Sequence, residues 1–366
     1  MRRILIKIHL YLGLAAAVFL VILGLTGAVM AFENEWNGAL NPSLLKVRHG
    51  ASTLPWEQIR QMVEAKQPDW KVQRMYMPST PGDSTYVRLE SRKNNKETAE
   101  IYVNQYTGEI LGWKLDANQL IWTIHAIHID LAAGKTGSRI VVASSVILLC
   151  LSLSGLILWW PHKIFRFAWN WPFRQVNYDL HRTLGFWASG AMLVFAITGL
   201  NLHLQTGGGL FAIMEDTAEP IIMPGHGISA DQLLQTAREA VPGAETMRIS
   251  FWNDGRPVLI QMRFPEDHTP AGRTSVTLDP RTGAVVKVVS SRTAPLWYVA
   301  LVQWNREIHT GTIFRRPSQA IASLLSLLLS VLAASGTTIW VSRQWSAALG
   351  RRRTLARASA RNSSPV

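Results

Sequence analysis

The chain has 366 residues, of which 48% are hydrophobic, and it carries a formal net charge of +13. This composition is too apolar for an ordinary soluble domain and predicts membrane-spanning segments. The single cysteine excludes an internal disulfide, and no C-x-x-C-H sequence is present for covalent attachment of haem.

Four apolar runs are long enough to cross a hydrocarbon layer of about 30 Å as helices. They cover residues 8–32, 140–160, 184–204 and 321–341. The alternative for the first run is a cleaved signal peptide. However, the run exceeds the roughly 7–15 residues of a signal core, and its near-copy "YDLHRTLGFW" is internal. We therefore expect four anchoring helices.

Basic residues precede the first run, fill the segment between the second and third, and follow the fourth. They include Arg2, Arg3, Lys7, Lys163, Arg166, Arg174, Arg182, Arg343 and Arg351. If the helices alternate in direction, all three places lie on one side, which the positive-inside rule makes the cytoplasm. Because the charge gathers at membrane edges, we expect no nucleic-acid partner, and we place both termini in the cytoplasm.

The expected organisation follows the four runs in chain order. It comprises transmembrane helix 1 (1–33), an outward domain with an interfacial helix (34–136), helix 2 (137–162), a cytoplasmic loop (163–180), helix 3 (181–204), a second outward domain (205–316), helix 4 (317–343) and a basic tail (344–366). We expect the tail to be disordered near anionic lipid.

Each outward segment predicts one helix followed by four strands. The first has a helix at 56–66 and strands near 72–78, 84–91, 99–104 and 109–113. The second has a helix at 230–240, strands near 245–252, 257–264 and 273–278, and one more strand after the turn at 279–283. The strands alternate with a period of two, and the turns carry Asp, Pro and Gly. The fold class is therefore an α+β membrane protein.

The chain contains an internal repeat that includes four histidines. His9 lies 17 residues before Thr26-Gly27, and His181 lies 17 before Thr198-Gly199. His128 lies 26 residues before Ser154-Gly155, and His309 lies 26 before Ser335-Gly336. Both halves begin and end on the same side, which indicates parallel repeats about a pseudo-two-fold axis along the membrane normal.

Such an axis would place His9 opposite His181 near the inner face and His128 opposite His309 near the outer face. Two opposed imidazoles suit the two axial positions of a haem iron. The alternative is that each histidine is only an interfacial polar residue. His125, three residues before His128, is a reserve ligand, and His203 is a further alternative. Arg182 and Lys7 are candidate partners for haem propionates on the inner side.

These motifs resemble the PepSY-associated transmembrane family. The resemblance rests on "IHLYLGL", "LHRTLGF", "YVNQYTGEILG", "VTLDPRTGAVV", "IHIDLAAGKTG" and "SGLILWW", and it covers roughly residues 4–345. It implies two PepSY-like domains in the periplasm, a bacterial inner-membrane location and two non-covalent b haems. The motif histidines of the family fall on His9, His128, His181 and His309.

The resemblance further implies a reductase that passes electrons across the membrane to a ferric siderophore and releases iron as Fe(II). The electron donor would be a quinol or a cytoplasmic flavoprotein. The alternative is a non-redox siderophore permease, or a membrane scaffold or regulator that acts through its periplasmic domains.

Overall fold

The computed structural model describes residues 1–94, 97–116, 119–160, 171–206, 228–252, 256–267, 269, 272–299, 302 and 304–362. Lys163 and Arg166 lie outside these residues. The chain divides into two compact units. The helical unit comprises Met1–Val29, Ile127–Leu200 and Ala322–Val366, and the sheet unit comprises Met30–Ala126 and Asn201–Ile321.

Four long helices confirm the predicted spans. They are α1 (Arg2–Met30), α6 (Gly134–Trp159), α7 (Phe173–Thr206) and α11 (Arg316–Asn362). Each is long and apolar enough to cross a membrane, and only 22–33% of each apolar window is buried in the protein. Their exposed faces carry large apolar side chains such as Leu153, Trp187 and Leu324. In water such faces would be costly, so these helices lie in lipid.

Small side chains allow the helices of the helical unit to approach closely. The core contains Ala16 and Leu20 of α1, Ala188 of α7 and Leu329 of α11. At Gly24 of α1, a Cβ atom would overlap Ser330 Oγ and lie 2.5 Å from the Ser326 carbonyl oxygen of α11. Ser330 Oγ also donates a hydrogen bond of 2.9 Å to the Val21 carbonyl. Glycine and serine therefore make the α1–α11 contact, as is common between helices in membranes.

The C-terminal segment differs from expectation. Residues 344–362 continue helix α11 rather than forming a disordered tail. Alanine, leucine and arginine dominate this segment, and all three favour helix strongly enough to extend a span that is already nucleated.

The sheet unit contains one antiparallel sheet of eight strands in the order β4-β3-β2-β1-β5-β6-β7-β8. The first half of the chain supplies β1 (Trp70–Tyr76), β2 (Thr85–Ser91), β3 (Thr98–Val103) and β4 (Ile110–Leu115). The second half supplies β5 (Glu245–Ser250), β6 (Val258–Arg263), β7 (Thr274–Leu278) and β8 (Val285–Val289). The two four-stranded meanders join through β1 and β5, where Met75 pairs with Ile249.

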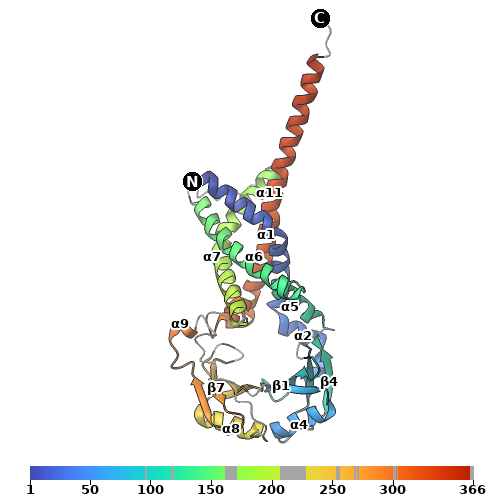
Figure 1. Ribbon diagram of the computed structural model, residues 1–366, viewed down its shortest axis with the longest axis vertical. Helices are drawn as coiled ribbons and strands as arrows, with labels where there is room; N and C mark the ends of the chain where they lie inside the picture. Colours follow the sequence, from blue (N-terminus) through green and yellow to red (C-terminus); the bar gives the residue numbers. More distant parts are fainter. Residues whose placement is uncertain are drawn as a thin grey trace. The chain divides into compact units, whose positions relative to one another are not determined.

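Helices α4 (Trp56–Lys66) and α8 (Ala230–Ala240) cover one face of this sheet (Figure 1). Alternate strand residues and the apolar faces of the two helices form the core. Each helix caps the other. Asp231 accepts hydrogen bonds of 2.9 Å from the Trp56 and Glu57 backbone N–H groups, and Glu57 accepts one of 2.9 Å from the Ala230 N–H. These carboxylates satisfy N–H groups that lack partners within their own helices.

Equivalent irregularities recur in both halves of the sheet. The β1–β2 register shifts between Val72 and Arg74, and the β5–β6 register shifts between Thr246 and Arg248. The turns after β3 and β7 both end on a glycine with positive φ, Gly108 at 76° and Gly283 at 71°. Such bulges and turn glycines are specific features, so their recurrence agrees with the predicted internal repeat.

Shorter helices connect these elements. They are α2 (Glu33–Leu40), α3 (Pro42–Leu45), α5 (Leu120–Asp130), α9 (Leu296–Tyr298), α10 (Asn305–Thr310) and the 3₁₀ helix η3 (Thr312–Phe314).

Candidate functional site

His9 and His181 make the same contact in the two halves of the helical unit. His9 Nδ1 lies 2.8 Å from Ser154 Oγ of α6, and His181 Nδ1 lies 2.8 Å from Ser335 Oγ of α11. Each of these two predicted ligands therefore lies against the Ser-Gly motif of a neighbouring span.

The glycine of each motif leaves space for the imidazole. A Cβ atom at Gly155 would lie 3.5 Å from His9 Cε1, and one at Gly336 would lie 3.1 Å from His181 Cε1. The latter distance is shorter than ordinary van der Waals contact. A larger residue at Gly336 would therefore displace the His181 ring.

The hydrogen bonds of the serine hydroxyl groups favour one tautomer of each histidine. Ser154 Oγ donates at 2.7 Å to the Cys150 carbonyl, and Ser335 Oγ donates at 3.0 Å to the Leu332 carbonyl. A hydroxyl has one proton, so a serine that donates it to its own helix carbonyl accepts a hydrogen bond from the histidine. This arrangement corresponds to the tautomer with the proton on Nδ1, which leaves the Nε2 lone pair available. Among the described residues, His9 has no hydrogen-bond partner besides Ser154, whereas His181 also interacts with the Leu332 backbone.

His128, near the end of α5, repeats this arrangement with a threonine. Its Nδ1 lies 2.9 Å from Thr26 Oγ1 of α1, and Thr26 Oγ1 donates at 2.7 Å to the Ile22 carbonyl. A Cβ atom at Gly27 would lie 3.1 Å from His128 Cε1. When Thr26 donates to its own helix in this way, it accepts from His128, which corresponds to the tautomer with the proton on Nδ1.

A compact turn after His128 holds this residue beside α1. Leu131 and Ala132 have φ values of 54° and 53°, in the left-handed region that costs non-glycine residues free energy. At Gly137, in the first turn of α6, a Cβ atom would overlap the Asp130 carbonyl. Glycine is therefore required for α6 to begin this close to the end of α5.

His309 lies on the short helix α10 in the sheet unit. This helix is anchored by a buried ion pair between Glu307 and Arg273, which are 6% and 8% exposed. It ends at Gly311, whose φ of 75° suits a helix C-cap. The opposition of His309 and His128 stays a prediction.

The reserve histidines have different surroundings. His125 Nδ1 lies 3.4 Å from Glu33 Oε1, too long for a strong hydrogen bond, and its ring stacks on Trp122 at 5.3 Å between centroids. His203 lies in the last turn of α7. In the described part of the chain, no three His, Cys, Asp or Glu residues gather as metal ligands.

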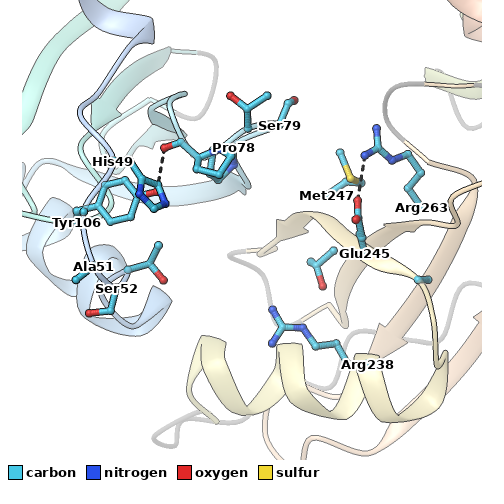
Figure 2. A pocket seen from close by; sticks show the side chains of 16 residues that line it. His49, Ala51, Ser52, Pro78, Ser79, Tyr106, Arg238, Glu245, Met247 and Arg263 are labelled. Atoms are coloured by element: carbon cyan, nitrogen blue, oxygen red, sulfur yellow. Dashed lines mark hydrogen bonds and ion pairs between the residues drawn. The ribbon is translucent and has the colours of Figure 1, made fainter.

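The sheet unit also has an open groove of about 630 Å³ between its two halves. Figure 2 shows His49 and Tyr106 on one side and Arg238, Glu245 and Arg263 on the other. Arg263 pairs with Glu245 at 3.0 Å. Arg238 is exposed and has no ion pair or hydrogen bond among the described residues, so it gives the groove an unpaired positive charge.

The family model described as PepSY-associated TM region matches residues 6–343. The chain belongs to this family. The PepSY-associated match includes the apolar core of each span and all four predicted ligand histidines, and it confirms the resemblance inferred from the sequence. A search of curated proteins finds no match to the chain.

Sequence reasoning missed the role of the hydroxyl groups in this PepSY-associated chain. The Ser-Gly and Thr-Gly motifs marked the repeat, but the sequence did not show that they contact the histidines. The signal was the constant spacing of each motif from a histidine in both halves. A hydroxyl that recurs with an imidazole in this manner is a candidate hydrogen-bond partner.

Proposed function

We propose that this protein is an inner-membrane reductase that binds two non-covalent b haems and passes electrons to a ferric siderophore in the periplasm. His9 and His181 would hold one haem, and His128 and His309 the other. The electron donor would be a quinol or a cytoplasmic flavoprotein. The three contacts between Nδ1 of His9, His181 and His128 and a hydroxyl group support the proposal most directly, because they suit the tautomer with a free Nε2.

An axial histidine binds iron through a neutral nitrogen and commonly donates its other ring N–H to a second group, which fixes the tautomer. The hydroxyl groups of Ser154, Ser335 and Thr26 are suited to that second role. An interfacial histidine can form its hydrogen bonds with water. It would not require a hydroxyl group that recurs beside the ring at three sites. The alternative of merely polar interfacial residues therefore leaves this repeated geometry unexplained.

Bound haem would supply one-electron redox chemistry. The protein would orient the imidazoles through these hydroxyl groups, admit the flat cofactor beside glycine, and exclude water with the apolar helices. The unpaired Arg238 would attract a negatively charged ferric chelate toward the sheet unit. Reduction would favour release, because the hard oxygen ligands of a siderophore suit Fe(III) better than Fe(II).

The test is to reduce the purified full-length protein with dithionite under anaerobic conditions, remove excess reductant, and add a panel of ferric siderophores. We expect the reduced spectrum of low-spin b haem to disappear as the chelate is reduced, with Fe(II) trapped by ferrozine. Protein purified without colour from haem-supplied cells would contradict haem binding. If the protein contains haem but no ferric chelate reoxidises it, the proposed acceptor is wrong while haem binding stands. That result would favour the scaffold alternative.

A further inference from the structure

Two arginines of the helical unit lie against one tyrosine and a third follows on the same helix face, and among the described residues none of them has an acidic partner. Arg174, Tyr178 and Arg182 follow one another at four-residue intervals on α7 and therefore share one helix face. The Arg182 Cζ atom lies 5.4 Å from the centre of the Tyr178 ring, and Arg343 Cζ of α11 lies 5.8 Å from it. Two guanidinium groups thus gather about a single aromatic ring.

Tyr178 and two of the three arginines line a small cavity between α7 and α11, and Arg182 lies beside it on the same face of α7. It has a volume of about 170 Å³ and is lined by Arg174, Gln175, Tyr178, Ile339 and Arg343. Since one water occupies about 30 Å³ of liquid, this space holds a few waters or one small polar group. The cavity is therefore a defined binding volume for a small polar group, which a diffuse basic surface would not provide.

The hydrogen-bonding capacity of these side chains is largely unused. Among the described residues, none of the three arginines forms an ion pair, and Arg182 Nη2 is buried without a hydrogen-bond partner. Arg174 donates only a long bond of 3.4 Å to Ser346. The nearby carboxylate of Asp179 accepts 2.7 Å from Gln175 instead. Like charges brought together without a counter-ion repel one another, so a bound anion would stabilise this arrangement.

Two of the arginines lie next to the apolar runs, where lipid headgroups are expected. Arg182 precedes the apolar run 184–204 by two residues, and Arg343 follows the run 321–341 by two residues. At about 1.5 Å per residue, both are roughly 3 Å from the hydrocarbon edge. Phe173, the first residue of α7, and Trp345, two residues after Arg343 on α11, are 74% and 69% exposed, as interfacial aromatic residues are.

We propose that Arg174, Tyr178, Arg182 and Arg343 form a binding site for the phosphate group of an anionic phospholipid. The guanidinium groups donate several hydrogen bonds to the phosphate oxygens and neutralise their charge, which is the chemistry that arginine performs best. The acyl chains would lie against exposed apolar side chains of α7 and α11, such as Trp187. Basic pockets between membrane helices are known to select such headgroups. The proposal does not depend on haem binding.

The experiment measures lipid retention by the full-length protein. The protein is placed in nanodiscs of phosphatidylcholine with a minor fraction of cardiolipin or phosphatidylglycerol, released into mild detergent, and examined by native mass spectrometry. We expect the wild type to retain the anionic lipid in preference to phosphatidylcholine. One basic residue at an anionic surface contributes about a fivefold effect, so Arg343→Gln and Arg174→Gln should each lower retention about fivefold.

Arg351→Gln is the matched control, because Arg351 is an exposed arginine on the same helix beyond the cavity. Equal loss of lipid in Arg351→Gln would overturn the proposal in favour of general basic attraction. Thermal stabilisation of the detergent-solubilised wild type by inorganic phosphate alone, with no lipid retained, would overturn the lipid assignment. A change of haem content in Arg343→Gln with normal lipid retention would assign the arginines to a haem propionate and would also overturn it.

Discussion

Removing the hydroxyl groups behind His9 and His181 tests the proposed tautomer. Ser154→Ala deletes the acceptor that lies 2.8 Å from His9 Nδ1, and Ser335→Ala deletes the equivalent acceptor of His181. Each change leaves an imidazole N–H in an apolar helix contact without its partner. Such a loss costs about 1–3 kcal/mol. For a group behind a metal ligand, the corresponding loss of affinity is about 10–100-fold.

The assay is a haem titration of protein from which haem has been extracted, followed by the Soret absorbance. Reduction potentials of the reconstituted protein provide a second measurement, because the hydrogen bond from a ligand's second nitrogen tunes the iron. We expect weaker binding at the inner site, a shifted potential for one haem, and an unchanged outer haem. Ser154→Thr, which keeps the hydroxyl, should restore both.

Two serines serve as matched controls, because their hydroxyl groups bond only within their own helices. Ser145 Oγ donates 3.0 Å to the Val141 carbonyl, and Ser342 Oγ donates 3.0 Å to the Ile339 carbonyl. Ser145→Ala and Ser342→Ala should leave haem affinity and potential unchanged. If Ser154→Ala and Ser335→Ala behave like these controls, the reasoning from the proton count is refuted.

Three further changes test the packing and charge of the fold. Gly24→Ala should lower the free energy of unfolding by about 1–3 kcal/mol, because the Cβ of the alanine would overlap Ser330. Denaturation in detergent measures this loss. A variant as stable as the wild type would contradict the close α1–α11 contact. Glu307→Ala should lower the free energy of unfolding by about 3–5 kcal/mol, because the variant leaves Arg273 charged and buried without its partner. A loss below about 1 kcal/mol would contradict the pairing. Burial alone would raise the pKa of Glu57, but hydrogen bonds from Arg60 and the Ala230 N–H lower it overall. Because the native pKa is below the unfolded value of about 4.3, its contribution to stability is present above that pH and is lost as the pH falls through the native pKa. Glu57→Gln should therefore weaken this pH dependence, and an identical acid-unfolding profile would exclude the reciprocal cap.

Much of the fold was predictable from local patterns. The predicted helices 56–66 and 230–240 have the bounds observed for α4 and α8, because apolar periodicity and the following Pro68 or Pro242 mark them. The pairing of β1 with β5 was not predictable. It joins strands about 170 residues apart, and no local pattern specifies which strand edge meets which.

The same division applies to the candidate site. The repeat predicted which histidines matter, because a spacing is visible in sequence. The hydrogen bonds from His9 to Ser154 and from His128 to Thr26 were not predictable, since they depend on how four helices pack side by side. The helical extension of α11 through residues 344–362 was misjudged because its basic charge was weighed above its helix propensity.

The most direct test of the central claim is the haem content of purified protein, measured as pyridine haemochrome per chain, for the wild type and for His181→Ala. The account predicts two haems per chain in the wild type and one in the variant. The haem that remains would be the one bound by His128 and His309. An unchanged content in His181→Ala, or a wild type without haem, would contradict it.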